Sequence, residues 1–141
     1  MKLNEIKESI YNFLQKELKD IKISKKRLND EEHIYMSLNP RRIKYQNKYH
    51  IEIEFYLNLE LSTKEKNNDE ELKIIEALKE VFQKQIKLQN RVLTTNKIFI
   101  FKDDNKNLNL RMDYSLIVKR NEDENQNEYQ KMKTLITREE F

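Results

Sequence analysis

The chain has 141 residues, enough for one domain with a hydrophobic core and too few for two ordinary domains. It contains no cysteine, which excludes disulfides, thiolate metal sites and a thiol nucleophile. It also contains no glycine, which excludes the P-loop and the Rossmann fingerprint, and a net charge of +3 is too small to argue for a nucleic-acid partner by itself.

Neither a signal peptide nor a transmembrane helix is predicted. Its opening residues lack the unbroken apolar run of a signal peptide, and no later stretch approaches the roughly 18 apolar residues of a transmembrane helix. We therefore expect a soluble protein made in the cytosol.

The first third of the chain predicts a helix followed by a short strand. Apolar residues at three- and four-residue steps predict an amphipathic helix over residues 3–19. Residues 21–23 are a candidate short strand, and residues 25–32 are a polar connection.

Two segments of alternating polarity predict a first hairpin. Residues 33–38 alternate, and residues 49–61 alternate without a break. Between them, Asn39-Pro40 is a turn signal, and residues 41–48 are predicted to form a basic loop. One face of the long strand is apolar, and the other carries three acidic residues, Glu52, Glu54 and Glu60.

The second half of the chain repeats the order of helix and hairpin. Asn68 is a predicted N-cap, and an apolar stripe predicts a helix over residues 69–89. Residues 97–101 and 107–119 are predicted strands, joined by a turn in which Asp and Asn replace glycine. A four-stranded antiparallel or mixed sheet with two helices on one face is the simplest way to bury these stripes. The predicted class is α+β, in the order α-β-β-α-β-β.

We expect this α+β domain to occupy residues 1–120. The acidic stretch at 121–128 breaks every pattern and predicts a flexible linker, so residues 121–141 form a linker and C-terminal arm. The candidate contacts of the arm are Met132, Leu135, Ile136 and Phe141.

No catalytic or metal-binding constellation stands out. His33 and His50 are predicted at outward strand positions, without a metal-ligand spacing. Glu52 and Glu54 lie two apart on one strand face, which would bring two carboxylates together for metal or acid–base chemistry. We favour a solvated strand face for this pair, and we expect no enzyme activity, no cofactor and no metal.

The basic segment 41–48 has three interpretations. Positive side chains beside tyrosines can follow phosphates and stack bases, but a lysine-rich loop in a lysine-rich protein is a simpler explanation. We favour a third, in which this segment meets the acidic face of the long strand on another copy, in head-to-tail contact that closes into a ring. A core of this size needs roughly six residues of strand, so about half of 49–61 would extend toward a neighbour. The candidate interface residues are Arg41, Arg42, Lys44, Tyr45, Lys48, Glu52, Glu54 and Arg111.

The pattern Tyr-x-x-x-Tyr-x-Ile-Glu-Ile-x-Phe from Tyr45 to Phe55 is similar to a strand signature of the tail terminator (tail completion) proteins of long-tailed phages and prophages in low-GC bacteria. An opening helix, a short strand and a mid-chain helix occur in the same order. The last strand, residues 110–119, also resembles that family, as do the charged linker after it and the Lys-Met-x-x-Leu pattern of the tail, here Lys131, Met132 and Leu135.

This resemblance implies a structural protein without enzymatic activity. Six copies would form a ring on the head-proximal end of the tail tube, stop tube polymerisation and dock to the neck. The implied partners are the chain itself, the tail tube protein, neck or head-completion proteins and the sheath, with no membrane partner. The implied place is the tail–neck junction of the virion, after assembly in the bacterial cytoplasm. The alternatives are another ring-forming neck or head-completion protein, or a small cytosolic nucleic-acid-binding module that uses Arg41–Lys48.

Overall fold

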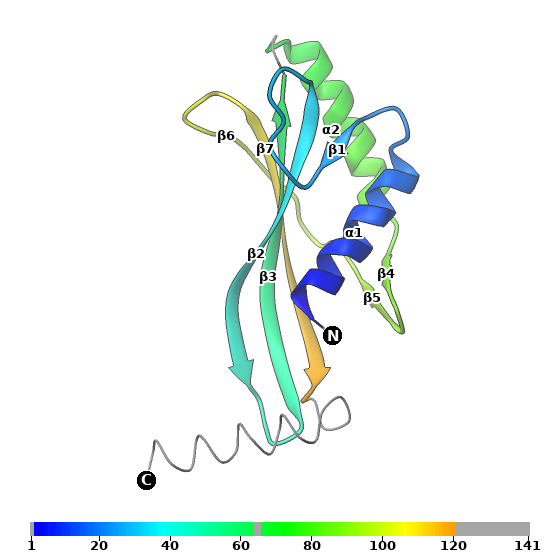
Figure 1. The fold of residues 1–141 in the computed structure, drawn as a ribbon, viewed down its shortest axis with the longest axis vertical. Helices are drawn as coiled ribbons and strands as arrows, with labels where there is room; N and C mark the ends of the chain where they lie inside the picture. The colour runs from blue at the N-terminus through cyan, green and yellow to red at the C-terminus, as the bar shows by residue number, and fades with distance from the viewer. Residues whose placement is uncertain (1, 64–65, 121–141) are drawn as a thin grey trace.

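The fold is a mixed β-sheet packed against two α-helices, in a computed structural model that describes residues 2–63 and 66–120 (Figure 1). The predicted α+β class is confirmed, but the sheet has five strands, and a separate two-stranded sheet accompanies it. The predicted linker and arm, with all four arm contacts, lie outside the described residues. The elements are α1 (Leu3–Glu17), β1 (Ile23–Ser24), β2 (His33–Tyr45), β3 (His50–Ser62), α2 (Asn68–Phe82), β4 (Ile86–Leu88), β5 (Arg91–Leu93), β6 (Phe99–Lys102) and β7 (Leu108–Lys119).

The large sheet has the strand order β1-β2-β3-β7-β6. The β2–β3 hairpin is antiparallel from His33 opposite Ser62 to Tyr45 opposite Ile51, with an irregularity in register between Pro40 and Arg42. β7 is antiparallel to β3 on its other side, and β6 is antiparallel to β7. The short β1 is parallel to β2, so the sheet is mixed.

The first helix is amphipathic, as its spacing predicts. Ile6, Ile10 and Leu14 are buried along one stripe, and helix packing on the sheet supplies most of the stability of such a helix. The helix ends at Glu17, and the Leu18 N–H still bonds the carbonyl of Leu14 at 2.8 Å.

The second helix is shorter than predicted. Its N-cap is Asn67, whose side chain accepts a hydrogen bond from the Asp69 N–H at 2.9 Å, and it ends at Phe82. Ile86 continues the helical spacing of the stripe, but together with Leu88 it also alternates at the spacing of a strand. Both are fully buried in β4, which pairs with β5 as a hairpin that the sequence did not predict.

The core lies between the helices and one face of the large sheet, here called the inner face. Both helices and the β4–β5 hairpin lie on the same side of the sheet (Figure 1). Phe55 and Tyr114 stack in this layer, with ring centroids 5.7 Å apart. Burying one such large apolar side chain contributes roughly 1.5–3 kcal/mol. The opposite, outer face has no helical layer in the described part of the chain.

Three strands, β2, β3 and β7, continue beyond the helices to the turn between β2 and β3 (Figure 1). We call this part, residues 41–54 and 115–119, the hairpin end. On the inner face of β2, Met36 is fully buried, whereas Ile43 and Tyr45 are 51% and 65% exposed. The helices therefore cover β2 at one end and leave its apolar side chains in water at the other.

Candidate assembly surfaces

The basic segment 41–48 is mostly a strand, so the predicted basic loop is wrong. Arg41, Arg42, Lys44 and Tyr45 belong to β2, and of the four predicted basic residues Lys48 alone lies in the turn. Pro40 does not end the strand because it sits at the irregularity in register, where a missing N–H is tolerated.

The turn that follows is closed by one asparagine. The Asn47 side-chain oxygen accepts hydrogen bonds from the Tyr49 and His50 N–H groups at 2.8 and 2.9 Å. Asn stabilises tight turns in this way without a glycine. The hairpin end is thus a defined structure and a suitable support for a surface.

Acidic and basic side chains meet within one chain on the outer face of the hairpin end. Arg42 lies directly opposite Glu54 and bonds it with two nitrogens, one at 3.0 Å. This hydrogen bond holds the pKa of Glu54 below its usual range and raises that of Arg42. Lys44 lies opposite Glu52, and Arg41 Nη1 is 3.8 Å from a carboxylate oxygen of Asp113. The pairing that the sequence suggested between copies is therefore available inside each copy.

Glu60, the third acidic residue on this face of β3, is covered by other segments of the chain. Glu60 lies on the outer face as its alternation predicts, but it is buried, so its predicted exposure is wrong. Its carboxylate bonds Arg27 at 3.0 Å and accepts a hydrogen bond from the Asn107 side chain at 3.2 Å. The connection before β2 and the β6–β7 turn supply these two partners, and both segments are distant from β3 in sequence. The exposed acidic residues of β3 on the outer face are consequently limited to Glu52 and Glu54.

Neither histidine belongs to a metal site in the described residues. His33 is buried, contrary to its predicted outward position, because the preceding connection folds over it. Its Nε2 accepts from the Leu28 N–H at 3.2 Å, and Nδ1 donates to the Glu31 carbonyl at 2.9 Å. His50 is half-buried beside Asn47. His33 therefore stabilises a loop.

Arg111 lies on the outer face, in a shallow polar hollow of about 260 Å³. Its guanidinium stacks 4.1 Å from the centre of the Tyr56 ring and bonds Asp113 at 3.0 Å. The floor is bridged by a hydrogen bond of 2.9 Å between the Asn58 and Asn109 side chains. The hollow is lined by Ser37, Asn39, Tyr56, Asn58, Phe101, Asn109 and Arg111. Its polar groups are largely bonded to one another, so it forms part of a surface.

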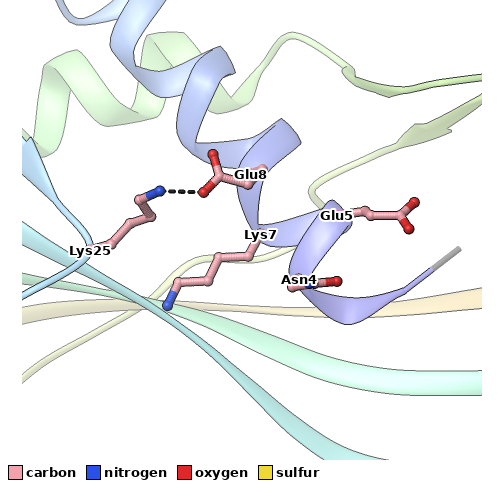
Figure 2. Close-up of a pocket in the computed structure, with 5 residues that line it drawn as sticks. All are labelled: Asn4, Glu5, Lys7, Glu8 and Lys25. Atoms are coloured by element: carbon pink, nitrogen blue, oxygen red, sulfur yellow. Dashed lines mark hydrogen bonds and ion pairs between the residues drawn. The ribbon is translucent and has the colours of Figure 1, made fainter.

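Another hollow, of about 520 Å³, lies along the first turns of α1 (Figure 2). Glu8 and Lys25 point at one another across it as an ion pair (Figure 2). Lys25 also lies 4.7 Å from the centre of the Tyr11 ring. Two acids, two lysines and one amide make a solvated groove with no nucleophile and base in contact. The lining residues are Asn4, Glu5, Lys7, Glu8 and Lys25.

Exposed apolar side chains gather at two other places. At the hairpin end, the Arg120 guanidinium lies 5.2 Å from the centre of the exposed Tyr45 ring, and Tyr49 is exposed on the turn. At the opposite end of the sheet, Phe99, Ile100 and Phe101 are all exposed on β6. The exposure of β6 does not follow from its sequence, because a short apolar run is equally typical of a strand buried on both faces.

Comparison of the chain with known protein families found no matching family, and comparison with curated proteins found no match. Neither described helix is long and apolar enough to cross a membrane.

Proposed function

We propose that the chain is a structural subunit of a phage or phage-like tail. In this role it caps the head-proximal end of the tail tube as a hexameric ring, ends tube polymerisation and docks to the neck or head. The observation that carries the proposal is the hairpin end, where β2 leaves Ile43 and Tyr45 in water on the face that elsewhere forms the core. Burial of apolar area is favourable by about 25 cal/mol per Å², so a second subunit that covers these side chains gains free energy.

The shape of the hairpin end supports contact between copies. It projects past the helices, so it can reach a neighbour without disturbing the core of its own subunit (Figure 1). A hairpin that contacts a different surface on the next copy makes a head-to-tail contact, and repetition of that contact closes into a ring. The Arg42–Glu54 pair is exposed and contributes little stability, so the charges here serve to orient a neighbour.

The resemblance to tail terminators supports the same surface. The pattern that carries it runs from Tyr45 to Phe55, which is the turn of the β2–β3 hairpin and the half of β3 at the hairpin end. Seven of the predicted interface residues lie in the hairpin end: Arg41, Arg42, Lys44, Tyr45, Lys48, Glu52 and Glu54. Arg111 lies further along the outer face, on β7.

The test is assembly of the purified full-length protein with and without tail tubes from the same particle. We expect native mass spectrometry or negative-stain imaging to show six-fold rings, alone or at tube ends. The double variant Ile43→Asp/Tyr45→Asp should fold normally and lose the rings, because two charges would be buried at the contact. Val92→Asp is the matched control, since Val92 is similarly exposed at 48% but lies on β5, and it should assemble as wild type.

Three outcomes would count against this proposal. Rings that survive the double variant would place the contact elsewhere on the subunit. Rings that bind neck proteins and not tubes would favour another neck or head-completion role. A monomer that binds a single-stranded DNA oligonucleotide with a steep salt dependence would favour the nucleic-acid-binding alternative.

A further inference from the structure

The outer edge of β6 is a strand edge without the usual protection. β6 pairs with β7 on one side, and in the described residues no strand pairs with its other side. Phe99, Ile100 and Phe101 are 48%, 50% and 45% exposed. Natural sheets protect such edges with proline, bulges or charged residues, since an apolar edge pairs readily with another chain. β2 has these devices at Pro40 and the positive charges that follow, whereas the apolar run of β6 has none.

The hydrogen bonds at the end of β6 show which of its residues direct their backbone N–H and C=O groups toward β7. The Asp103 N–H donates to the carbonyl of Asn107 at 3.1 Å, so the backbone at Asp103 faces β7. In an antiparallel ladder, residues alternate between facing one neighbour and facing the other. Phe101 and Phe99 therefore face β7 as Asp103 does, and Ile98, Ile100 and Lys102 present their N–H and C=O groups to the unpaired edge.

The sequence along this edge is self-complementary. Residues 97–103 are KIFIFKD, in which Phe99 and Phe101 flank Ile100 and opposite charges, Lys97 and Asp103, stand three residues away on either side. We propose that β6 pairs with β6 of a second copy of this chain, antiparallel, with Ile100 on the two-fold axis. Ile100 then lies opposite its own copy, and each outward-facing residue exchanges both backbone hydrogen bonds with its partner.

The side chains favour this register. Phe99 lies opposite Phe101 of the second copy on the outer face, and aromatic cross-strand pairs each contribute roughly 0.2–1 kcal/mol. Lys97 lies opposite Asp103 of the second copy at both ends of the contact. The alternative axis between Phe99 and Ile100 would place Lys97 opposite Lys102, a like-charge pair that disfavours it. Charge and aromatic pairing thus select the axis at Ile100.

This contact is separate from the proposed ring surface. β6 pairs with Leu108–Arg111 of β7, which lies beside the end of β3 farthest from the hairpin end. An isologous two-fold contact closes on itself and adds one copy only. The two surfaces can therefore be occupied together, and each can fail without the other.

The test uses the full-length protein with Ile100→Cys as its only cysteine, because the natural chain has none. Paired strands place residues on the two-fold axis about 5.5 Å apart, within reach of a short bismaleimide cross-linker. We expect a covalent dimer as the main product at micromolar protein. Val92→Cys is the control, since its exposure is similar and its place on β5 is outside the contact; it should give at least tenfold less dimer.

A second variant measures the same contact without a cross-linker. Ile100→Pro removes an N–H that faces the unpaired edge and is not used by β7, so the fold should survive. Light scattering should show dimers for wild type and a dimer dissociation constant raised at least tenfold for the variant. The cross-link should also persist in the Ile43→Asp/Tyr45→Asp background, which separates this contact from ring assembly. Equal cross-linking at residues 92 and 100, a monomeric wild type at high concentration, or open-ended aggregates in place of dimers would each overturn the proposal.

Discussion

Arg42 and Glu54 show how one residue pair acts at the hairpin end. Their opposition across the β2–β3 ladder follows from the register, and the resulting hydrogen bond lowers the pKa of Glu54. Because both side chains are exposed, the pair contributes little to stability. Its main effect is on the electrostatic character of the surface that we propose to contact a neighbour, where positive and negative groups lie side by side.

Tyr114 is the residue for which we expect a measurable effect of pH. Burial raises its pKa to about 12, although a hydrogen bond of 2.6 Å with Thr95 opposes the shift. The neutral form is favoured by folding, so this contribution is fully present below the ordinary pKa of about 10 and is lost as pH rises toward 12. Between about pH 9 and about pH 11, the wild type should lose about 1 kcal/mol more unfolding free energy than Tyr114→Phe.

The measurement is urea unfolding of both proteins at the two pH values. The comparison with Tyr114→Phe is needed because lysines also titrate in this range and affect both proteins equally. Parallel pH dependences for the two proteins would contradict the burial of the Tyr114 hydroxyl.

At the scale of elements, turns without glycine have a conformational free-energy cost, because residues with a Cβ atom adopt positive φ values in them. Asp30, Gln89 and Lys106 have positive φ values of 67°, 37° and 62°. A left-handed backbone is unfavourable for residues with a Cβ atom, and most so for those that lack the local hydrogen bonds of Asn or Asp. Lys106 occupies such a position in the turn between β6 and β7.

We expect Lys106→Gly to stabilise the protein by about 0.5–1 kcal/mol, because relief of a left-handed conformation that costs about 1–2 kcal/mol outweighs the destabilisation of roughly 0.5–1 kcal/mol from glycine's freedom in the unfolded chain. Asn105→Gly in the same turn is the control, since Asn105 is not among the positive-φ residues. There glycine should lower stability by about 0.5–1 kcal/mol through its greater freedom in the unfolded chain. Thermal or urea unfolding would measure both, and a destabilised Lys106→Gly would show that the lysine side chain matters more than the turn geometry.

At the scale of the whole molecule, the sheet has two functions at its two ends. Over the helices it completes a core, and at the hairpin end β2 exposes Ile43 and Tyr45 while Ile53, Leu116 and Val118 of β3 and β7 stay buried. The last hydrogen bond in the described chain joins the Arg120 N–H to the Tyr49 carbonyl at 2.7 Å, which ties the end of β7 to the hairpin turn. The described core needs no residue beyond Val118.

We therefore expect truncation after Arg120 to leave the fold intact. The unfolding free energy of the 1–120 protein should stay within about 0.5 kcal/mol of the full-length value, as for surface changes in general. If residues 121–141 form an arm that docks on a neighbouring protein, binding to tubes or neck proteins should weaken in the same variant. Loss of cooperative unfolding by circular dichroism would show instead that these residues complete the core.

Sequence by itself determined the class of the fold, the order of its main elements and the face that the two long alternating strands, β3 and β7, bury. Strict alternation in the long strand and regular stripes in both helices leave one arrangement in which all apolar positions meet. The candidate interface was inferred in the same way, from a strand longer than a core of this size requires, but the inner-facing residues of β3 are buried from Ile53 onward.

Tertiary structure decided which side chains are buried and which are exposed, because this depends on the segments that pack over them. Phe82 and Ile86 fit a helix by spacing, yet Ile86 pairs with Leu93 in the β4–β5 hairpin, which packs against α1. Glu60 has the outward position that its alternation predicts, but Arg27 and Asn107, distant in sequence, cover it. β6 lies at an edge, so its apolar residues are exposed. Periodicity specifies the direction of a side chain, whereas its exposure depends on segments that contact it only after folding.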